Sequence, residues 1–347
     1  MDLSRPRLLQ GQQGVRQLLV ILGHGFLGQR RMRGIPATVV QHQLVPFLFV
    51  CVRPVWCSAG HHHIAAINPV TGQAICWGRN TDGQCDVPTG LPRLIAIAAG
   101  ETHTAAITVD GQLVVWGRQR ISVLQLEQIS RGPFVMVAAG YQDTVLVTSM
   151  GHIAWYGGGC NPYSRGAGSM RALRDHTSVV AIAWKGYHGL ACTPGGVFGW
   201  GSNTYGESDV PNLTTDITNS VSQVAVGECW SAVLTVCGRV TVWGCNRHSI
   251  SEASGITGVQ AIGAGLNHLL LQFVNGDIHG IGHNAFAQCC TPVAFDATLC
   301  VKLDGGVDHS LCLTVAANLH CWGMDRGATD ITLHQSPLRP TLRLDSL

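Results

Sequence analysis

Histidine and cysteine are the residues of this chain that could do chemistry, as metal ligands, general bases or nucleophiles. The 347 residues include 16 His and 14 Cys. No two cysteines have the Cys-x-x-Cys spacing that often holds zinc, and the adjacent Cys289 and Cys290 cannot easily chelate one ion together. His61, His62 and His63 fall in a predicted strand, where neighbouring side chains point to opposite faces. We therefore expect no metal site and no cofactor.

Four histidines occupy one recurring position, three residues after a glycine. They are His63, His103, His268 and His309. A catalytic histidine is normally unique, so this recurrence indicates a structural hydrogen bond that fixes a turn. Asp143 and Trp230 replace the histidine in two further copies of the pattern. Because the chain has no nucleophile elbow, phosphate loop or usefully spaced carboxylate pair, we expect that it is not an enzyme.

The glycines before these histidines belong to an internal repeat of about forty residues, and such a repeat decides the fold. The leading glycines are Gly60, Gly100, Gly140, Gly186, Gly227, Gly265 and Gly306. The closing glycines are Gly78, Gly117, Gly157, Gly201, Gly244, Gly282 and Gly323. Most closing glycines follow a tryptophan that we expect to pack in the core, at Trp77, Trp116, Trp200, Trp243 and Trp322. Ile281 replaces this tryptophan in copy six, and copy three reads Trp155-Tyr156-Gly157.

A third marker lies between the other two and predicts the turn of a β-hairpin. It consists of Gly72, Gly111, Gly151, Gly196, Gly238 and Gly276. In the seventh copy we expect Asn318 to fill this place, because asparagine also tolerates a positive φ. The dipeptides Asp110-Gly111 and Asn275-Gly276 are strong hairpin signals, and the flanking segments have the length and β-branched content of strands.

Seven hairpin repeats predict an all-β chain folded as a seven-bladed β-propeller. One antiparallel repeat cannot bury both of its faces, whereas radial stacking covers each sheet with the next. We assign residues 1–45 to an N-terminal extension, 46–335 to the propeller and 336–347 to a tail or closing strand. Whether the extension folds or targets the protein stays open. Ring closure stays open too, since either 339–345 or Leu44–Val52 could supply an extra strand.

These motifs resemble the regulator-of-chromosome-condensation repeat family over most of the chain. Trp77-Gly78-Arg79-Asn80 leads to Gly83-Gln84, and Trp200-Gly201-Ser202-Asn203 leads to Gly206-Glu207. The spacing looks like a compact variant similar to alpha-tubulin-suppressor-like proteins. The resemblance implies a seven-bladed propeller and leaves the activity open, because one fold hosts unrelated functions.

We expect a protein-interaction scaffold that presents variable loops on a rigid frame. The candidate interaction residues follow the Trp-Gly pairs and are Arg79, Asp82, Tyr205, Arg247 and Phe286. Aromatic residues and arginine dominate binding hot spots, which favours the last three. Members of the resembled family occur beside ubiquitin-ligase domains, so recruitment of substrates to ubiquitin machinery in trans is one form of this hypothesis.

The alternative function is guanine-nucleotide exchange on a small GTPase, which the founding member of the resembled family performs. It implies a protruding wedge and acidic residues on one rim. The longest insertion, 157–174, instead carries Arg165, Arg171 and Arg174. Light sensing, known for a plant photoreceptor of this fold, would need tryptophans clustered beside arginines on one rim. Trp56, Trp184 and Trp230 are scattered in the sequence and predict no such cluster.

Charge and composition limit the partners further. The net charge is +2, only 12% of residues are charged, and Lys185 and Lys302 are the only lysines. Nucleic-acid binding needs clustered basic residues, so we expect no nucleic-acid partner. Apolar runs such as 18–22 are too short to cross a bilayer, so we expect no membrane partner. Small buried thiols indicate a reducing compartment, which favours the cytoplasm or the nucleus. The partner's identity, the rim that binds it and the oligomeric state stay open.

Overall fold

The computed structural model describes residues 56–118, 133–157, 179–213, 221–292, 300–324 and 329–332. The chain divides into two compact units, Met1–Phe49 and Val50–Leu347, and all described residues belong to the second. The predicted extension, nearly all of the insertion 157–174, the predicted tail and both segments considered for ring closure lie outside the described residues. The domain boundaries at 45 and 335 therefore stay predictions.

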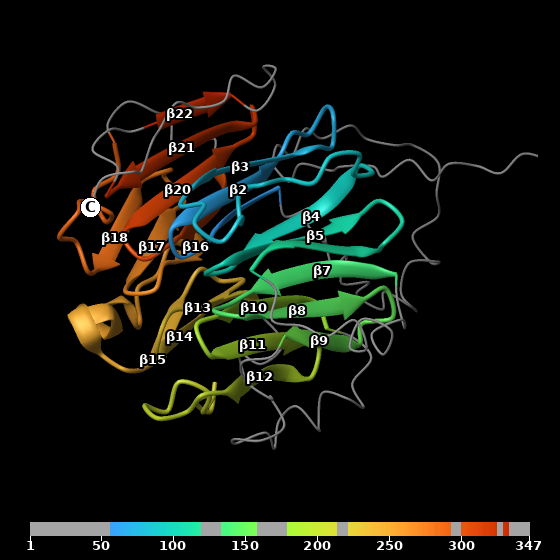
Figure 1. The fold of residues 1–347 in the computed structure, drawn as a ribbon. Coiled ribbons are helices and arrows are strands. Elements are labelled where there is room, and N and C mark those ends of the chain that lie inside the picture. The colour runs from blue at the N-terminus through green and yellow to red at the C-terminus, as the bar shows by residue number, and fades with distance from the viewer. Residues whose placement is uncertain are drawn as a thin grey trace, which may run out of the picture. The chain divides into compact units, whose positions relative to one another are not determined.

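Short antiparallel strands form seven sheets, one for each repeat (Figure 1). Blades one to three are β1 (Cys57–Ala59), β2 (His63–Ile67) and β3 (Ala74–Gly78); β4 (Leu94–Ala99), β5 (His103–Thr108) and β6 (Leu113–Gly117); and β7 (Phe134–Ala139), β8 (Asp143–Thr148) and β9 (Ile153–Gly157). Blades four and five are β10 (Ala181–Lys185), β11 (His188–Thr193) and β12 (Gly196–Gly201); and β13 (Val221–Val226), β14 (Trp230–Thr235) and β15 (Val240–Gly244), followed by a 3-10 helix, η1 (Arg247–Ala253). Blades six and seven are β16 (Val259–Ala264), β17 (His268–Phe273) and β18 (Ile278–Gly282); and β19 (Cys300–Gly305), β20 (His309–Thr314), β21 (Asn318–Gly323) and β22 (Thr329–Thr332).

The seven sheets close into a ring. The first strand of each blade packs against the first strand of the next, from β1 and β4 through to β16 and β19, and β19 packs back against β1. At the seam the amide of Val307 donates to the carbonyl of His61, and the amide of Ala59 donates to a carboxylate oxygen of Asp304. The all-β fold with seven blades is therefore confirmed. Within the described residues, β22 on the outer edge of β21 is the one fourth strand of a blade.

Small apolar residues fill the space between neighbouring blades. Ala98 and Ala105 of blade two, both buried, pack with Val137 and Leu146 of blade three. Side chains without much bulk let adjacent sheets approach closely near the axis, which radial stacking requires. The tryptophans before the closing glycines line these interfaces as predicted, and Trp200 is fully buried. In blade three Tyr156 pairs with Thr144 as Trp116 pairs with Thr104, so tyrosine takes the tryptophan place there.

The leading glycines join each blade to the next through backbone hydrogen bonds around the axis. The amide after the glycine donates to the next blade, from Glu101 to Gly140 O at 3.1 Å and from Tyr141 to Gly186 O at 3.3 Å. A Cβ atom on Gly100 would lie only 2.6 Å from that oxygen of Gly140, and it would also meet the His103 ring. Glycine is required at Gly100 because two chain segments approach too closely there for a side chain.

In blade four the leading position is one residue earlier than the sequence predicted. Lys185 pairs with His188 in the sheet, in the same relation in which Gly100 donates to His103 O. Gly186 therefore lies in the turn, where its carbonyl accepts the hydrogen bond from Tyr141. The prediction of Gly186 as the leading glycine was wrong by one residue, because a lysine, Lys185, occupies the leading position of this blade.

The seventh hairpin turn also differs from the prediction. Ala317 has the left-handed conformation, with φ 59°, and Asn318 is the first residue of β21. Ala317 is buried among apolar residues of blades one and seven. A polar asparagine would be poorly placed there, so packing favours the small apolar residue in spite of its backbone strain.

Three of the four recurring histidines, His63, His103 and His268, form hydrogen bonds between blades, which supports their structural role, whereas Nε2 of His309 is buried without a hydrogen-bond partner among the described residues. Nε2 of His63 lies 2.8 Å from Oγ1 of Thr104 in the next blade, and that hydroxyl donates to the Gln84 carbonyl at 2.8 Å. Because the hydroxyl proton is committed to Gln84, the histidine must donate from Nε2–H. His103 contacts Thr144 similarly, and His268 uses Ser310. Each relay ties a rim loop to the next blade.

Blade four contains a relay histidine that the sequence pattern missed. His188 lies 3.0 Å from Oγ of Ser231, which donates to the carbonyl of Glu207. It escaped notice because the count began at Gly186 and not at Lys185. Burial lowers the pKa of His63 and His268 to about 3, and that of His103 and His188 to about 4. The relay histidines are therefore neutral donors.

The close approach at the leading glycines predicts that Gly100→Ala destabilises the ring. We expect the free energy of unfolding to fall by about 1–3 kcal/mol, the usual cost of overpacking against rigid backbone. At Gly195 a Cβ atom would meet only Oγ1 of Thr193, at 3.6 Å, so Gly195→Ala should leave stability unchanged or raise it by under about 1 kcal/mol. Denaturant unfolding measures both variants. Equal stabilities would contradict the assigned contact.

Neutral buried histidines predict that stability falls on acidification. The unfolded chain protonates its histidines near pH 6.5, whereas folded His63 and His103 do so only near 3 and 4. The unfolded state therefore binds more protons in this window, and each relay histidine lowers the free energy of unfolding by about 1.4 kcal/mol per pH unit of acidification. Urea titrations from neutral pH to about pH 4 measure the slope. His152→Gln, outside the relays, should leave it unchanged, and a flat profile would refute the neutral relays.

Candidate interaction surface

One face of the propeller carries two sets of loops, and we call it the loop face. The amide after each closing glycine donates to the turn after the leading position, as from Arg79 to His62 O and from Arg118 to Thr102 O, both at 2.8 Å. The same bond recurs in blades four to seven. The closing glycine allows this through a positive φ, 92° at Gly117, where a Cβ atom would meet the Thr102 oxygen at 2.6 Å. All five predicted interaction residues follow a closing glycine and lie on this face.

A shared loop motif presents three of the five predicted residues at equivalent positions. In blade one the Gln84 side chain accepts the amide of Asp82 at 2.9 Å. In blade four a carboxylate oxygen of Glu207 accepts the amide of Tyr205, and in blade six the Gln288 oxygen accepts that of Phe286. These buried acceptors form a constant support. The residue held above them varies, as expected of a recognition loop on a fixed frame.

The asparagines in the same loops have a structural role. Asn80 accepts the amide of Cys85 and donates to Asp86, and Asn203 does the same with Ser208 and Asp209. These bonds close the loop on itself, so each asparagine is committed to fixing the turn.

Tyr205 and Arg247 form a contact between two neighbouring blades. The Arg247 guanidinium donates to the Tyr205 hydroxyl at 3.2 Å and lies 5.5 Å from the centre of its ring. Tyr205 is 49% exposed, and Arg247 is exposed as well. An arginine already stacked on an aromatic ring loses less entropy when it binds a partner. Sequence analysis chose both residues, and the structure brings them together.

Phe286 lies in a separate group on the loop face. It is 41% exposed, and its ring meets the His283 ring edge-on at 6.2 Å between centres. His283 in turn contacts the His248 ring and lies 3.5 Å from a carboxylate oxygen of Asp308. The phenyl ring therefore stands at the edge of a polar cluster, where a partner could cover it.

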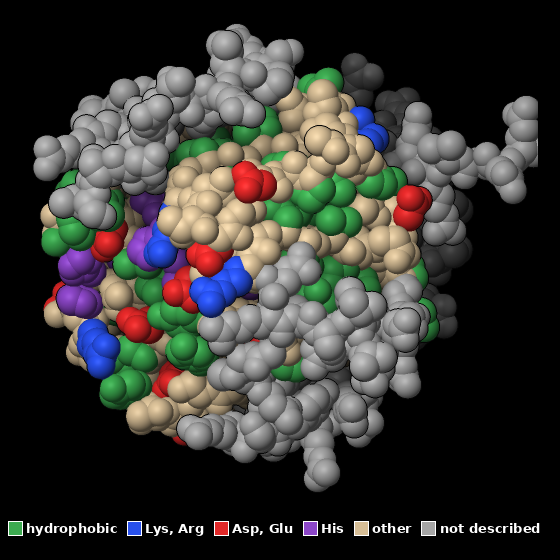
Figure 2. All heavy atoms as spheres, in the orientation of Figure 1, with side chains coloured by type: hydrophobic (Ala, Val, Ile, Leu, Met, Phe, Trp, Pro, Cys, Tyr) green, Lys and Arg blue, Asp and Glu red, His purple; other side chains and the backbone are tan. Residues whose placement is uncertain are grey.

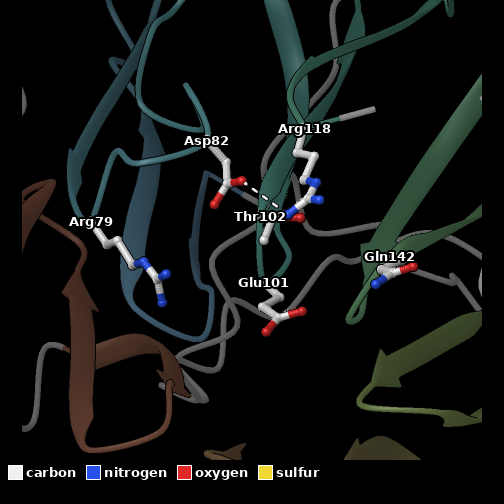
Figure 3. Close-up of a pocket in the computed structure, with 6 residues that line it drawn as sticks. All are labelled: Arg79, Asp82, Glu101, Thr102, Arg118 and Gln142. Carbon is white, nitrogen blue, oxygen red and sulfur yellow. Dashed lines mark ion pairs between the residues drawn. The ribbon is translucent and has the colours of Figure 1, made fainter. Parts of the chain in front are cut away.

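Arg79 and Asp82 line a polar cavity of about 220 Å³ on the loop face of blades one to three (Figure 3). The other lining residues are Glu101, Thr102, Arg118 and Gln142. Arg118 forms an ion pair with Asp82 at 3.5 Å, whereas the Arg79 side chain donates to Thr81. Burial raises the pKa of Glu101, although both arginines oppose this. The two predicted residues thus share the cavity with four residues that sequence analysis did not select. These four lie one or two residues after a leading or closing glycine, which is the sequence feature that could have identified them.

The centre of the ring is crossed by Lys185. Its Nζ donates to the carbonyls of Ala264 in blade six and Gly305 in blade seven, and lies 3.2 Å from a carboxylate oxygen of Asp304. Burial alone would raise the pKa of Asp304, but Lys185, Lys302 and two backbone amides hold it below its usual value. Lys302 donates to the Cys57 carbonyl across the seam. Both lysines of the chain therefore lie near one aspartate.

The opposite face consists of hairpin tips and has a different character. Its exposed large apolar residues are Val70, Val109, Met150, Val236, Val274 and Val315. Each of them precedes the left-handed residue of its hairpin turn by one or two positions, and together they come from six blades. The exposed large apolar residues of the loop face are instead Tyr187, Tyr205, Phe286 and Met324. Within the described part of the chain, the exposed aromatic residues among these lie on the loop face alone, which favours that face for specific recognition.

Tryptophans in blade four pack together in the core. The rings of Trp184 and Trp200 stack with centres 5.8 Å apart, and both are buried. Gly189 makes room for them, since a Cβ atom there would lie 2.9 Å from Trp200 and closer to Trp184. Sequence analysis named Trp184 among three tryptophans scattered in the sequence. The stacked pair lies inside the propeller and away from the exposed loop residues.

The described ranges contain neither a metal-binding cluster nor a membrane-spanning helix. No group of three His, Cys, Asp or Glu side chains there is arranged to hold a metal ion. His61 packs edge-on against Tyr141 with ring centres 4.3 Å apart, while His63 belongs to its relay. Among the same residues no helix is long and apolar enough to span a bilayer. On the face seen in Figure 2, acidic and basic side chains are interspersed.

Comparison with known proteins supports the repeat assignment. Residues 94–120 match the family model described as Regulator of chromosome condensation (RCC1) repeat. The chain is 29% identical over 236 residues to Ultraviolet-B receptor UVR8 of Arabidopsis thaliana, covering 54% of this chain and 52% of that protein. The chain thus spans about half the length of this curated relative.

Two further relatives differ in what their names describe. E3 ubiquitin-protein ligase HERC2 of Homo sapiens is 25% identical over 264 residues, which cover 63% of this chain and 5% of that protein. Secretion-regulating guanine nucleotide exchange factor of Bos taurus is 24% identical over 297 residues, covering 65% of this chain and 63% of that protein.

A solved structure supports the fold. The crystal structure of human WBSCR16 aligns with a TM-score of 0.59 at 19% identity, covering 74% of this chain and 86% of that one. At this identity the likeness concerns the fold alone.

The link between Lys185 and Asp304 predicts strong energetic coupling. The other blades have glycine at the position of Lys185, and blade two has alanine, Ala98, at the position of Asp304. These residues are therefore suitable replacements. Lys185→Gly and Asp304→Ala should each destabilise the protein by about 3 kcal/mol, because each leaves the other charge without its ion-pair partner. The double variant should lose less than the sum, with a coupling of about 1–3 kcal/mol. Denaturant unfolding of the four proteins measures it, and additive losses would contradict the pair.

Proposed function

We propose that this chain, which belongs to the regulator of chromosome condensation repeat family, is a non-catalytic scaffold that binds a protein partner through its loop face. The supporting observation is the loop motif in which Gln84, Glu207 and Gln288 hold a variable residue at an equivalent place. A constant support with a variable tip is how repeat proteins diversify binding while the frame stays fixed.

The physical properties of this face suit protein recognition. Tyr205 and Arg247 join two blades in one exposed contact, and Phe286 adds a third large side chain from another loop. Tyrosine and arginine carry most of the binding energy in protein interfaces because they combine a large contact area with directional hydrogen bonds. The loops stand on buried relays, so little order has to be gained on binding.

The relatives' names suggest two forms of this function. Similarity to a ubiquitin ligase, confined to 5% of that protein's length, supports recruitment of substrates to ubiquitin machinery supplied by another chain. Similarity to a guanine nucleotide exchange factor over about two thirds of both chains favours exchange on a small GTPase as the second candidate. Fold and function are separable in such families, so the two forms need a direct test.

The proposal predicts that partner binding depends on Tyr205 and Arg247. Truncating an interface hot spot costs about 2 kcal/mol or more, which corresponds to roughly a thirtyfold loss of affinity. We expect a Tyr205→Ser/Arg247→Ser variant to lose specific partners in quantitative affinity purification with mass spectrometry. Val274→Ser, at a 73% exposed residue of the hairpin-tip face, is the matched control and should keep them. Circular dichroism confirms that both variants fold.

Three readouts separate the forms of this function. A ubiquitin ligase among the lost partners supports recruitment in trans. Accelerated nucleotide release from a captured small GTPase, measured with a fluorescent nucleotide, would replace the scaffold proposal by the exchange function. Loss of partners only in the Val274→Ser variant would move binding to the hairpin-tip face and refute the proposed surface.

A further inference from the structure

The turns nearest the ring axis place two tyrosines between two glutamates. Glu101, Tyr141, Tyr187 and Glu228 come from blades two, three, four and five in that order, and each lies one or two residues after the leading position of its blade. We call this set the inner arc. Consecutive blades are neighbours in the ring, so the arc runs along one side of the axis opening on the loop face.

The tyrosines of the inner arc form one aromatic unit. The Tyr141 and Tyr187 rings stack with centres 4.5 Å apart and planes 25° apart. His61 supports the far side of Tyr141 edge-on, and Tyr187 is 45% exposed. Gly186 lies between the turns of Tyr141 and Glu228, where a Cβ atom would lie 3.3 Å from the Glu228 carbonyl oxygen and 3.6 Å from the Tyr141 ring. An aromatic surface is therefore held rigidly at the opening.

The two glutamates differ from the other acidic residues of the loop face. Asp82 pairs with Arg118, Glu207 accepts from Ser202 and Tyr205, and Asp308 faces His283. Glu101 and Glu228 are half-buried, yet neither carboxylate has a hydrogen-bond or ion-pair partner among the described residues. A partly buried carboxylate without a partner is costly, and it is stabilised when a cation arrives.

Among the described residues, the arginines of the neighbouring loops already have partners. Arg79 donates to Thr81, Arg118 pairs with Asp82, and Arg247 lies on Tyr205. The pKa of Tyr141 rises to about 12, chiefly through burial and then through Glu228, Tyr187 and Glu101. The carboxylates therefore act on the aromatic pair from both sides of the arc, and the local field favours a positive charge.

We propose that the inner arc binds an arginine side chain of a protein partner. The guanidinium plane would stack on the exposed tyrosine face while its N–H groups donate to Glu101 or Glu228. Lysine fits less well, because its compact ammonium cannot stack in a plane or bind a carboxylate in a bidentate way. The inference rests on the proposed scaffold function and specifies the chemistry of its partner.

A labelled short glycine-serine peptide carrying two arginines tests the arc directly by fluorescence anisotropy on the full chain. Peptides with lysine or with neutral citrulline in the same places are the comparison. We expect binding in the order arginine, lysine, citrulline, with weakening at higher salt. The Glu101→Gln/Glu228→Gln variant should lose about tenfold in affinity for the arginine peptide, since neither side chain can then offer a charge-assisted contact.

Two matched variants keep the test specific. Glu252→Gln makes the same change at an exposed carboxylate of η1 and should leave binding unchanged. Tyr187→Leu retains an apolar side chain but removes the aromatic face, so it should reduce the preference for arginine over lysine. Circular dichroism and thermal unfolding verify that each variant is folded.

Equal binding of the arginine and citrulline peptides would overturn the arc proposal, and so would unchanged affinity in the folded Glu101→Gln/Glu228→Gln variant. These failures differ from a failure of the scaffold function. If Tyr205→Ser/Arg247→Ser abolishes partner capture while the arc variant keeps it, the loop face binds a protein without the arc. If the arginine peptide binds the arc, and the Glu101→Gln/Glu228→Gln variant loses partner capture while Tyr205→Ser/Arg247→Ser keeps it, the arc stands and the surface around Tyr205 and Arg247 is refuted.

Discussion

Close contact of backbone with backbone around the axis is what the propeller depends on. Glu101 can donate to the carbonyl of Gly140 because Gly100 has no side chain, and Gly140 has none where the carbonyl of Gly186 approaches it. The histidine relays connect the same neighbouring blades, as His103 does through its hydrogen bond to Thr144. In the relays of His63, His188 and His268, the hydroxyl that contacts the histidine donates to a loop carbonyl. The contacts between blades and the loops of the loop face therefore form one hydrogen-bonded network. A loop residue such as Tyr205 is held in place by this network.

The repeat made the fold predictable because each marker has a local physical cause. A closing glycine needs a positive φ, and a leading glycine needs room for a neighbouring carbonyl, so both leave a trace in the sequence. The errors arose where one position changed its chemistry. Lys185 in place of a glycine shifted the count and hid His188, and Ala317 took a left-handed turn because burial there favours an apolar side chain over Asn318.

The candidate surface was predictable only in part. Tyr205, Arg247 and Phe286 follow recognisable Trp-Gly pairs, so type and position pointed to a rim. The inner arc could not be inferred in the same way, because Glu101 and Glu228 are separated by more than a hundred residues and become related only when the ring closes. Similarly, the absence of a partner for a carboxylate is a property of packing, and a sequence pattern contains no record of it.

Lys185 gives an otherwise repetitive ring a unique orientation. Lys185 belongs to blade four and its carboxylate partner, Asp304, belongs to blade seven, so the ion pair joins distant parts of the sequence. An assembly of only the first blades would contain this charge without Asp304, whereas the full ring neutralises it. The ion pair therefore stabilises the complete ring over rings with fewer blades or with blades in another order. Stacking interactions that are alike in every blade cannot make this distinction.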